Sequence, residues 1–527
     1  MSLARVLAAV ASGVAFVLAV PDTGWGWLGF GMLVPWLWAI EGLAPRRAAA
    51  LGQVTGFVAM FGGFFWMTEL LGRFAKMSAI PALLVHAAFS GIQAAQWAAA
   101  SALYVWLRAR TGRGPLVCAP LAFVAGEALA PHLFPTYVAL AWWDMPLWTQ
   151  LAEVGGVGLV GGALAAINAA AYTLTRGWDR RAFAVLVALL AGVPTFGAWR
   201  IAEADALAAA SPTARFGVVQ GNHGIREWSK AETKPDVLAR LQAQSAVLDA
   251  EGVDVLLWGE NTYPYRKVLP RDGGEDAPAW HPERVRVGFD APLVLGAVTA
   301  EAATDGPVPD PTRNPYPWNS ALVLHADGTF GDVYDKNYPL WFGEHAPLVD
   351  PAWYLRNVPG ASHVNAGTEV AALRVGPWRL GALVCYEDIL PRFVRRVIAE
   401  DVHVLVNLTS DTWFGAGAEP TQHLGLAVFR SIEHRRAMVR DSNTGPSALV
   451  DPAGRVVIRT AITDPDANGP AAPDGFVADV PMIDPAHRTF YARVGAWFEA
   501  LVILAMVALA IRGSDQQRDA ERLRRRA

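Results

Sequence analysis

The chain has 527 residues, a formal net charge of −4 at pH 7 and a mean hydropathy of +0.25. Because 53% of its residues are hydrophobic, it is too apolar for an ordinary soluble enzyme of this size, and membrane-spanning segments are expected. The arginines at the C-terminus form a local tail and not a nucleic-acid-binding surface, so no nucleic-acid partner is expected. They are Arg512, Arg518, Arg522, Arg524, Arg525 and Arg526.

Apolar segments of membrane-spanning length occupy the first 200 positions and recur near the C-terminus. About eight are expected: 3–20, 27–44, 51–72, 79–107, 115–134, 151–175, 182–200 and 495–511. Basic residues follow alternate segments, with Arg73 and Lys76 as the exceptions. The positive-inside rule therefore places both termini in the cytoplasm and the long segment between the seventh and eighth spans outside. The predicted domains are a membrane domain with seven transmembrane helices (1–200), an outer domain (201–494), and a final helix with the basic tail (495–527).

Several polar residues lie within or near these spans, and two interpretations of them stay open. They either line a lipid or headgroup cavity or form hydrogen bonds between helices. The residues are Glu41, Glu69, His86, Gln93, Gln96, Glu127, Glu153 and Asn168. Gly156, Gly158 and Gly161 match a dinucleotide-binding pattern, but no strand precedes them, so close helix packing is the better interpretation.

The outer segment changes to an alternation of strand-like and helical patterns, which predicts a layered α/β domain. The expected strands are 215–220, 253–258, 292–299, 320–325, 370–375, 379–384 and 402–408. The expected helices are about 235–250, 389–400 and 421–440.

Cys385 follows an apolar strand-like run, and Asp388 is a plausible N-cap for the next helical pattern. Such a turn exposes the thiol and points free backbone N–H groups toward an approaching substrate. This arrangement suits a nucleophile, because the N–H groups can stabilise the oxyanion that forms. The alternative is a small buried core cysteine. The other cysteine, Cys118, lies in an apolar span and is not expected to form a disulfide with Cys385.

Two more polar residues stand at predicted strand ends. Glu260 closes an apolar run, and Lys336 follows the second strand of a predicted hairpin. A carboxylate can take a thiol proton, and an ammonium group favours the thiolate and stabilises an oxyanion. Each residue taken singly is better explained as an ordinary surface charge or core thiol.

Four sequence motifs change that balance. They are Glu260-Asn261-Thr262-Tyr263-Pro264; Lys336 through Phe342-Gly343-Glu344-His345-Ala346-Pro347; Val384-Cys385-Tyr386-Glu387; and Asn407-Leu408-Thr409-Ser410-Asp411-Thr412-Trp413-Phe414-Gly415. The first three resemble, in order and spacing, the motifs of the nitrilase superfamily. With the fourth motif and the apolar segments, essentially the whole chain resembles the apolipoprotein N-acyltransferases of bacterial inner membranes.

The resemblance implies a polytopic α-helical membrane domain of about eight spans and a periplasmic α/β domain with a nitrilase-like αββα sandwich. It implies that Glu260 is the general base, Lys336 the oxyanion stabiliser and Cys385 the nucleophile. Three supporting residues are implied, Glu344, Tyr386 and Glu387. The expected substrate-binding residues are Trp228, Trp341, Phe342, Trp413 and Phe414. For Trp341 and Phe342, packing under the domain stays an open alternative to contact with lipid.

The implied reaction moves a fatty acyl chain from a phospholipid to Cys385 and then to the α-amino group of a diacylglyceryl-cysteine at a lipoprotein N-terminus. The implied partners are the phospholipid donor, diacylglyceryl-modified apolipoproteins and membrane lipids, for a monomeric multi-pass protein of the bacterial inner membrane. Two alternatives are a membrane-tethered amidohydrolase acting on a small amide and a catalytically silent scaffold. Trp258-Gly259 and Ser410 depart from the usual family pattern, which leaves room for a divergent paralogue.

No cofactor is implied. The histidines of the outer segment lack the spacing of a metal-binding helix, and we interpret them as structural or rim residues. They include His363, His403, His423 and His434.

Overall fold

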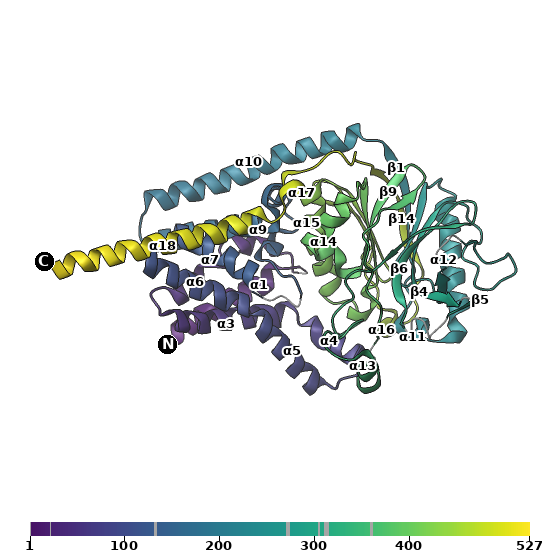
Figure 1. Ribbon diagram of the computed structural model, residues 1–527, viewed down its shortest axis with the longest axis horizontal. Helices are drawn as coiled ribbons and strands as arrows, with labels where there is room; N and C mark the ends of the chain where they lie inside the picture. The colour runs from purple at the N-terminus through teal and green to yellow at the C-terminus, as the bar shows by residue number, and fades with distance from the viewer. Residues whose placement is uncertain are drawn as a thin grey trace. The chain divides into compact units, whose positions relative to one another are not determined.

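The computed structural model describes residues 2–21, 23–130, 134–269, 274–303, 306–309, 316–358 and 362–526, without the side chains of 267–269, 302–303, 306–309 and 513–526. The arginines of the tail from Arg518 onward therefore lie outside the described side chains. The chain divides into two compact units (Figure 1). The first comprises Met1–Thr68, Ala79–Ala202 and Thr489–Ala527, and the second comprises Glu69–Ser78 and Glu203–Arg488.

The first unit is helical, and each predicted apolar segment coincides with a helix or with neighbouring helices. Its larger helices are α1 (Leu3–Ala19), α2 (Val34–Ile40), α3 (Pro45–Gly63), α4 (Trp66–Arg73), α5 (Ala79–Gln93), α6 (Ala95–Thr111), α7 (Pro115–Leu129), α9 (Ala152–Thr175), α10 (Arg180–Ala210) and α18 (Trp497–Arg526). The last residues of α4 and of α10 belong to the second unit. The shorter ones are η1 (Gly26–Phe30), η2 (Val138–Trp142), α8 (Pro146–Thr149) and α17 (Phe490–Val494). Helix α6 packs against α3 and α7, and α18 packs against α6, α7 and α9.

Among the described residues, two helices, α9 and α10, are long and apolar enough to cross a membrane. A third candidate arises if α3 and α4, bent by 56°, count as one span. The helices α1 and α7 and the stretch Gly26–Ile40 are apolar but shorter. The first unit is thus a helical region with candidate membrane spans.

Polar residues inside the first unit bridge its elements, which supports the helix-to-helix interpretation for several of them. Asn168 accepts a hydrogen bond from the Leu33 backbone N–H and donates to the Gly29 carbonyl. Glu127 accepts from the Val138 N–H at 2.8 Å. A Cβ at Gly156 would lie 2.6 Å from the Tyr491 ring, and its φ of +69° is left-handed, so this glycine serves close packing at a kink in α9.

The second unit contains two β-sheets. The first has the strand order β14-β1-β2-β4-β6-β7, and β3 and β5 also pair with β4. Its strands are β1 (Thr213–Gln220), β2 (Val255–Trp258), β3 (Lys267–Leu269), β4 (Leu293–Ala303), β5 (Gly306–Pro309), β6 (Trp318–Leu324), β7 (Phe330–Asp335) and β14 (Asp474–Pro481). The second has the order β13-β12-β11-β10-β9-β8. Its strands are β8 (Leu373–Val375), β9 (Trp378–Val384), β10 (Val404–Thr409), β11 (Met438–Ser442), β12 (Ala448–Val450) and β13 (Val456–Arg459).

Helices cover the outer faces of the two sheets, which face each other through β6 and β9 and through β1 and β11. Helix α12 (Lys234–Asp249) packs on β1, β2 and β14. Helices α14 (Pro391–Ala399) and α15 (Glu419–His434) lie on the other side (Figure 1). The unit is therefore an αββα sandwich, and the predicted α/β class of the outer segment is confirmed.

Three local predictions need correction. The helix expected over 421–440 ends at His434, because Arg435 is left-handed (φ +50°) and 438–442 form strand β11. Asp388 does not cap the next helix, because α14 begins after Leu390 with Pro391 in its first turn. Residues Cys385–Ile389 form a separate 3-10 turn, η4, and Asp388 is buried within it. The strands β11 to β14 were not predicted, since fully buried or edge runs give no clear alternation.

Candidate active site

Three strand ends supply the predicted catalytic residues. Glu260 lies just after β2, Lys336 directly after β7 and Cys385 directly after β9. β2 and β7 belong to the first sheet and β9 to the second, so residues from both sheets contribute. All three are buried, with exposed fractions of 6%, 1% and 9%.

The Lys336 ammonium donates to two carboxylates. Its Nζ lies 3.1 Å from Glu260 Oε1 and 2.6 Å from Glu344 Oε2. The Leu340 backbone N–H also donates to Glu344 Oε2, at 2.8 Å. The structure therefore brings the predicted supporting residue Glu344 into direct contact with Lys336.

Asn319, which the sequence did not single out, links the two carboxylates. Its Nδ2 donates to Glu260 Oε1 at 2.7 Å and to Glu344 Oε1 at 2.8 Å. It lies in β6 and is 1% exposed. The sequence could have pointed to Asn319 only as a polar residue in an apolar strand, which must find a hydrogen-bond partner when buried. The sequence pattern does not show which residues those partners are.

Burial dominates the electrostatics of the site. It raises the pKa of Glu260, although Lys336 opposes the shift. It also raises the pKa of the Cys385 thiol well above its usual value, and the Glu260 charge adds to this. For Lys336, burial lowers the pKa, but the charges of Cys385, Glu260 and Glu344 outweigh it and hold the pKa well above 10.5. The Lys336 ammonium group therefore stays charged, and its charge lowers the pKa of the Cys385 thiol against the effect of burial.

The turn after β9 holds Cys385 in a left-handed backbone conformation, with φ +55°. Glu387, two residues later, accepts hydrogen bonds from the Val384, Asn337 and Tyr338 N–H groups and from the Tyr334 hydroxyl, at 2.7 to 3.0 Å. Burial raises the pKa of Glu387 to about 7. This carboxylate joins the Cys385 turn to the segment that follows Lys336.

Two family models match the chain. Residues 12–170 match the apolipoprotein N-acyltransferase N-terminal domain, and 215–465 match carbon-nitrogen hydrolase. The apolipoprotein N-acyltransferase of Gloeobacter violaceus is 30% identical over 545 aligned positions, which cover 96% of this chain and 94% of the relative. The chain belongs to the apolipoprotein N-acyltransferase family.

Other members of the family show similar coverage. The enzyme of Geobacter metallireducens is 28% identical over 85% of this chain and 86% of its own length, and that of Sinorhizobium medicae is 30% identical over 85% and 86%. An amidase of the nitrilase superfamily from Nesterenkonia sp. AN1 has 18% identity and a TM-score of 0.36, covering 55% of this chain and 97% of the amidase.

The predicted substrate-binding residues lie in three segments of this apolipoprotein N-acyltransferase family member. Trp341 and Phe342, 52% and 57% exposed, occupy the turn between Lys336 and Glu344. Trp413 is partly exposed and packs edge-on against Phe74, whereas Phe414 is buried. Trp228 ends the short helix α11 (Ile225–Trp228) and is half-buried. Substrate contact by these residues stays a prediction.

A group of three described residues has the composition of a metal site. Ligand atoms of Asp411, Glu419 and His423 all lie within 4.8 Å of one another. Arg440 donates to Asp411 Oδ2 at 2.8 Å, and His423 Nε2 lies 2.9 Å from Asp388 Oδ1. The charges in this cluster already pair with one another, so the cluster needs no cation to balance them. The absence of a metal from the reaction stays a prediction.

Proposed function

We propose that this member of the apolipoprotein N-acyltransferase family N-acylates the diacylglyceryl-cysteine of lipoprotein N-termini, with a phospholipid as acyl donor and a Cys385 thioester as intermediate. The observation that carries the proposal is the buried contact of Lys336 with Glu260, because the Lys336 Nζ lies 6.0 Å from the ring centre of Tyr386, the residue after Cys385, and both charges act on the Cys385 thiol. A thioester divides one difficult transfer into two easier steps. Family membership supports the choice of donor and acceptor.

In the first step, Glu260 takes the proton of the Cys385 thiol as the sulfur attacks an ester carbonyl of the phospholipid. The Lys336 ammonium stabilises the oxyanion that forms, and its raised pKa keeps it charged for this role. When the tetrahedral intermediate collapses, the ester C–O bond breaks, and Glu260 returns the proton to the leaving lysophospholipid. Cys385 is left as the thioester.

In the second step, the α-amino group of the lipoprotein attacks the thioester carbonyl. Glu260 takes a proton from the amine, and Lys336 again stabilises the oxyanion. The C–S bond breaks, the amide is formed, and Cys385 recovers its proton from Glu260. The burial of all three groups limits access of water, which would otherwise hydrolyse the thioester.

The same proposal includes the arrangement of the chain in the bacterial inner membrane as a monomer. Seven helices within 1–200 and one within 495–511 would span the bilayer, and the sandwich unit would face the periplasm, where its acceptor is presented. The positive-inside pattern of the connecting segments supports this orientation. A reporter fused after Ala527 should then lie in the cytoplasm, whereas a tag inserted between positions 272 and 282 should react with an impermeant reagent from the periplasmic side.

The test is to incubate the purified protein with phospholipid vesicles alone. Cys385 should accumulate an acyl adduct that hydroxylamine removes, Cys385→Ala should show none, and Cys118→Ala should behave as wild type. The adduct should persist until a diacylglyceryl peptide with a free amine is added. An adduct that survives Cys385→Ala overturns the proposal, and one that hydrolyses equally fast without the peptide favours the amidohydrolase.

A further inference from the structure

The backbone of Cys385 adopts an unfavourable conformation, and the contacts of Lys336 with Glu260 and Glu344 do not hold it there. Its φ of +55° lies in the left-handed region, which residues with a side chain adopt only where their surroundings hold them. The carbonyl oxygen of Cys385 accepts a hydrogen bond from Asn407 Nδ2 at 2.9 Å. Asn407 lies in β10, beside β9, and is fully buried.

A second contact fixes the orientation of the Asn407 amide. Its Oδ1 accepts from Arg440 Nη1 at 2.9 Å. Because a guanidinium group only donates, the oxygen of the amide must face Arg440 and the NH2 group must face Cys385. Arg440 lies opposite Asn407 in the neighbouring strand β11, so the sheet register sets this contact.

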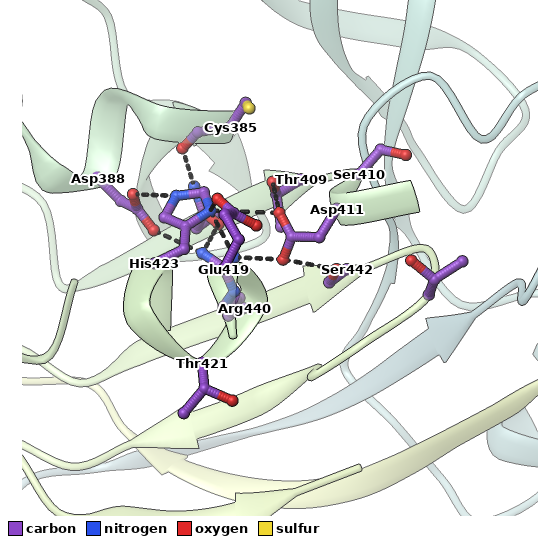
Figure 2. A network of polar contacts seen from close by, with 12 residues as sticks. Cys385, Asp388, Thr409, Ser410, Asp411, Glu419, Thr421, His423, Arg440 and Ser442 are labelled. Atoms are coloured by element: carbon purple, nitrogen blue, oxygen red, sulfur yellow. Dashed lines mark hydrogen bonds and ion pairs between the residues drawn. The ribbon is translucent and has the colours of Figure 1, made fainter. Parts of the chain in front are cut away.

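Arg440 also holds the other end of the Cys385 turn. The same Nη1 donates to Asp388 Oδ2 at 2.7 Å, and Asp388 stands three residues after Cys385. Nη2 donates to Asp411 Oδ2 at 2.8 Å. His423 closes the ring, with Nε2 2.9 Å from Asp388 and Nδ1 3.2 Å from Asp411 (Figure 2).

The cluster of Arg440, Asp388, Asp411 and His423 is more deeply buried and more extensively connected than an ion pair that serves stability alone. Arg440, Asp388 and Asp411 are each 0% exposed, so two carboxylates and a guanidinium group are kept away from water. Such an arrangement is costly to desolvate, and apolar residues of similar volume in its place would often leave the free energy of unfolding unchanged. Its contacts converge on the two ends of one turn, the carbonyl of Cys385 through Asn407 and the side chain of Asp388.

We propose that Asn407 and Arg440 are positioning residues that hold the Cys385 turn in its left-handed conformation and so aim the sulfur at the acyl carbonyl. Neither residue is assigned a contact with substrate. Arg440 acts through Asn407 and Asp388, and Asn407 acts through the Cys385 carbonyl. The inference deepens the proposed acyl transfer and rests on it for its kinetic test, but the conformation of the turn can also be measured without any acyl donor.

The decisive variant is Asn407→Asp. It keeps the size of the side chain and an acceptor for Arg440, but it replaces the donor that faces the Cys385 carbonyl with a second acceptor. The single-turnover rate of Cys385 acylation should fall by about 10- to 100-fold, the scale of a small misplacement of a reacting group. The KM for phospholipid vesicles should stay within about twofold, because the donor site is unchanged.

The matched control is Asn222→Asp. Asn222 is a buried asparagine of the same unit, and it donates to the Ala472 carbonyl at 2.7 Å. The control should keep the wild-type acylation rate. Arg440→Lys, which keeps the charge but loses the fork that reaches Asp388, Asn407, Asp411 and His423, should reduce the rate to a similar degree as Asn407→Asp.

Alkylation of Cys385 by iodoacetamide, in a Cys118→Ala background, separates this inference from the proposed function. Asn407→Asp should change the rate and pH profile of alkylation, whereas Asn222→Asp should not. If wild-type protein forms no acyl adduct but this contrast appears, the positioning role stands and the proposed reaction fails. Equal alkylation and acylation rates in Asn407→Asp and wild type, or equal losses in both aspartate variants, overturn the inference.

Discussion

The ammonium group of Lys336 lies 3.1 Å from Oε1 of Glu260, although 76 positions separate the two residues. β2 and β7 run in the same direction and end at the same edge of one sheet, with β4 and β6 between them, and the segments that follow the two strands bring the two residues together. It joins a group proposed to take a proton to a group proposed to stabilise negative charge. The two functions are therefore electrostatically linked, and changes at either residue should affect both.

The pH dependence of acylation should report this link. Burial raises the pKa of Glu260 above 4.5, so the carboxylate needed as a base forms only as pH rises through that higher value. The rate should thus increase with pH along an acid limb whose midpoint lies above 4.5. Single-turnover acylation over a pH series measures it. A limb centred at or below the value of a free glutamate would contradict the assignment of Glu260 as the base.

Removal of the Lys336 ammonium should slow the reaction strongly. Lys336→Met should lower the single-turnover acylation rate by about 100-fold or more, because one oxyanion donor is lost in a buried site. The exposed residue Lys230 provides a control, and Lys230→Met should leave the rate unchanged. Circular dichroism tests whether the variant folds. A folded Lys336→Met protein with a normal acylation rate would remove Lys336 from the mechanism.

The segment Glu69–Ser78 should stabilise the loop that carries Trp413. Arg73 donates to both carboxylate oxygens of Asp464, at 3.0 and 2.5 Å, and Phe74 packs against Trp413. In Arg73→Ala, amide hydrogen exchange in the turn 411–415 should become about three- to fivefold faster, because a partly buried ion pair is lost. Arg374→Ala is the control, since the pair of Arg374 with Asp332 is largely exposed. Equal exchange in both variants would show that the contact does not stabilise the loop.

The ion cluster around Arg440 should make stability depend on pH. Burial and Arg440 oppose protonation of His423, but Asp388 and Asp411 raise its pKa to about 10. Burial opposes ionisation of Asp411, but Arg440 and His423 lower its pKa to about 2. Burial and the negative charge of Asp411 hold the pKa of Glu419 well above 4.5, so its contribution to stability is also lost as pH rises above 4.5.

These pKa shifts determine whether the free energy of unfolding rises or falls with pH. The contribution of His423 is complete below its unfolded pKa of 6.5 and is lost as pH rises toward 10, whereas that of Asp411 is complete above 3.8 and is lost as pH falls toward 2. Stability should therefore fall by up to about 1.4 kcal/mol per pH unit above 6.5. Thermal unfolding of wild type and His423→Gln measures the difference, and the decline should be smaller in the variant, which keeps the contribution of Glu419 but not that of His423. A parallel decline in both proteins would refute it.

The sequence by itself determined the class of both parts of the chain and the three residues of the proposed catalytic centre. Apolar length and composition predicted the helices of the first unit, because these properties are local. Glu260, Lys336 and Cys385 were identified because each ends a strand-like run and lies in a motif that resembles those of the nitrilase superfamily in order and spacing.

Tertiary structure decided the partners of these residues. Asn319 and Asn407 are single polar residues in buried strands, and nothing adjacent in sequence indicates that one joins two glutamates and the other holds the Cys385 carbonyl. Asp388 looked like a helix cap because the pattern could not show that Arg440, 52 positions later, lies in reach of it. The physical reason is the sheet: strand pairing sets which side chains meet across long separations, and burial then makes each such contact obligatory.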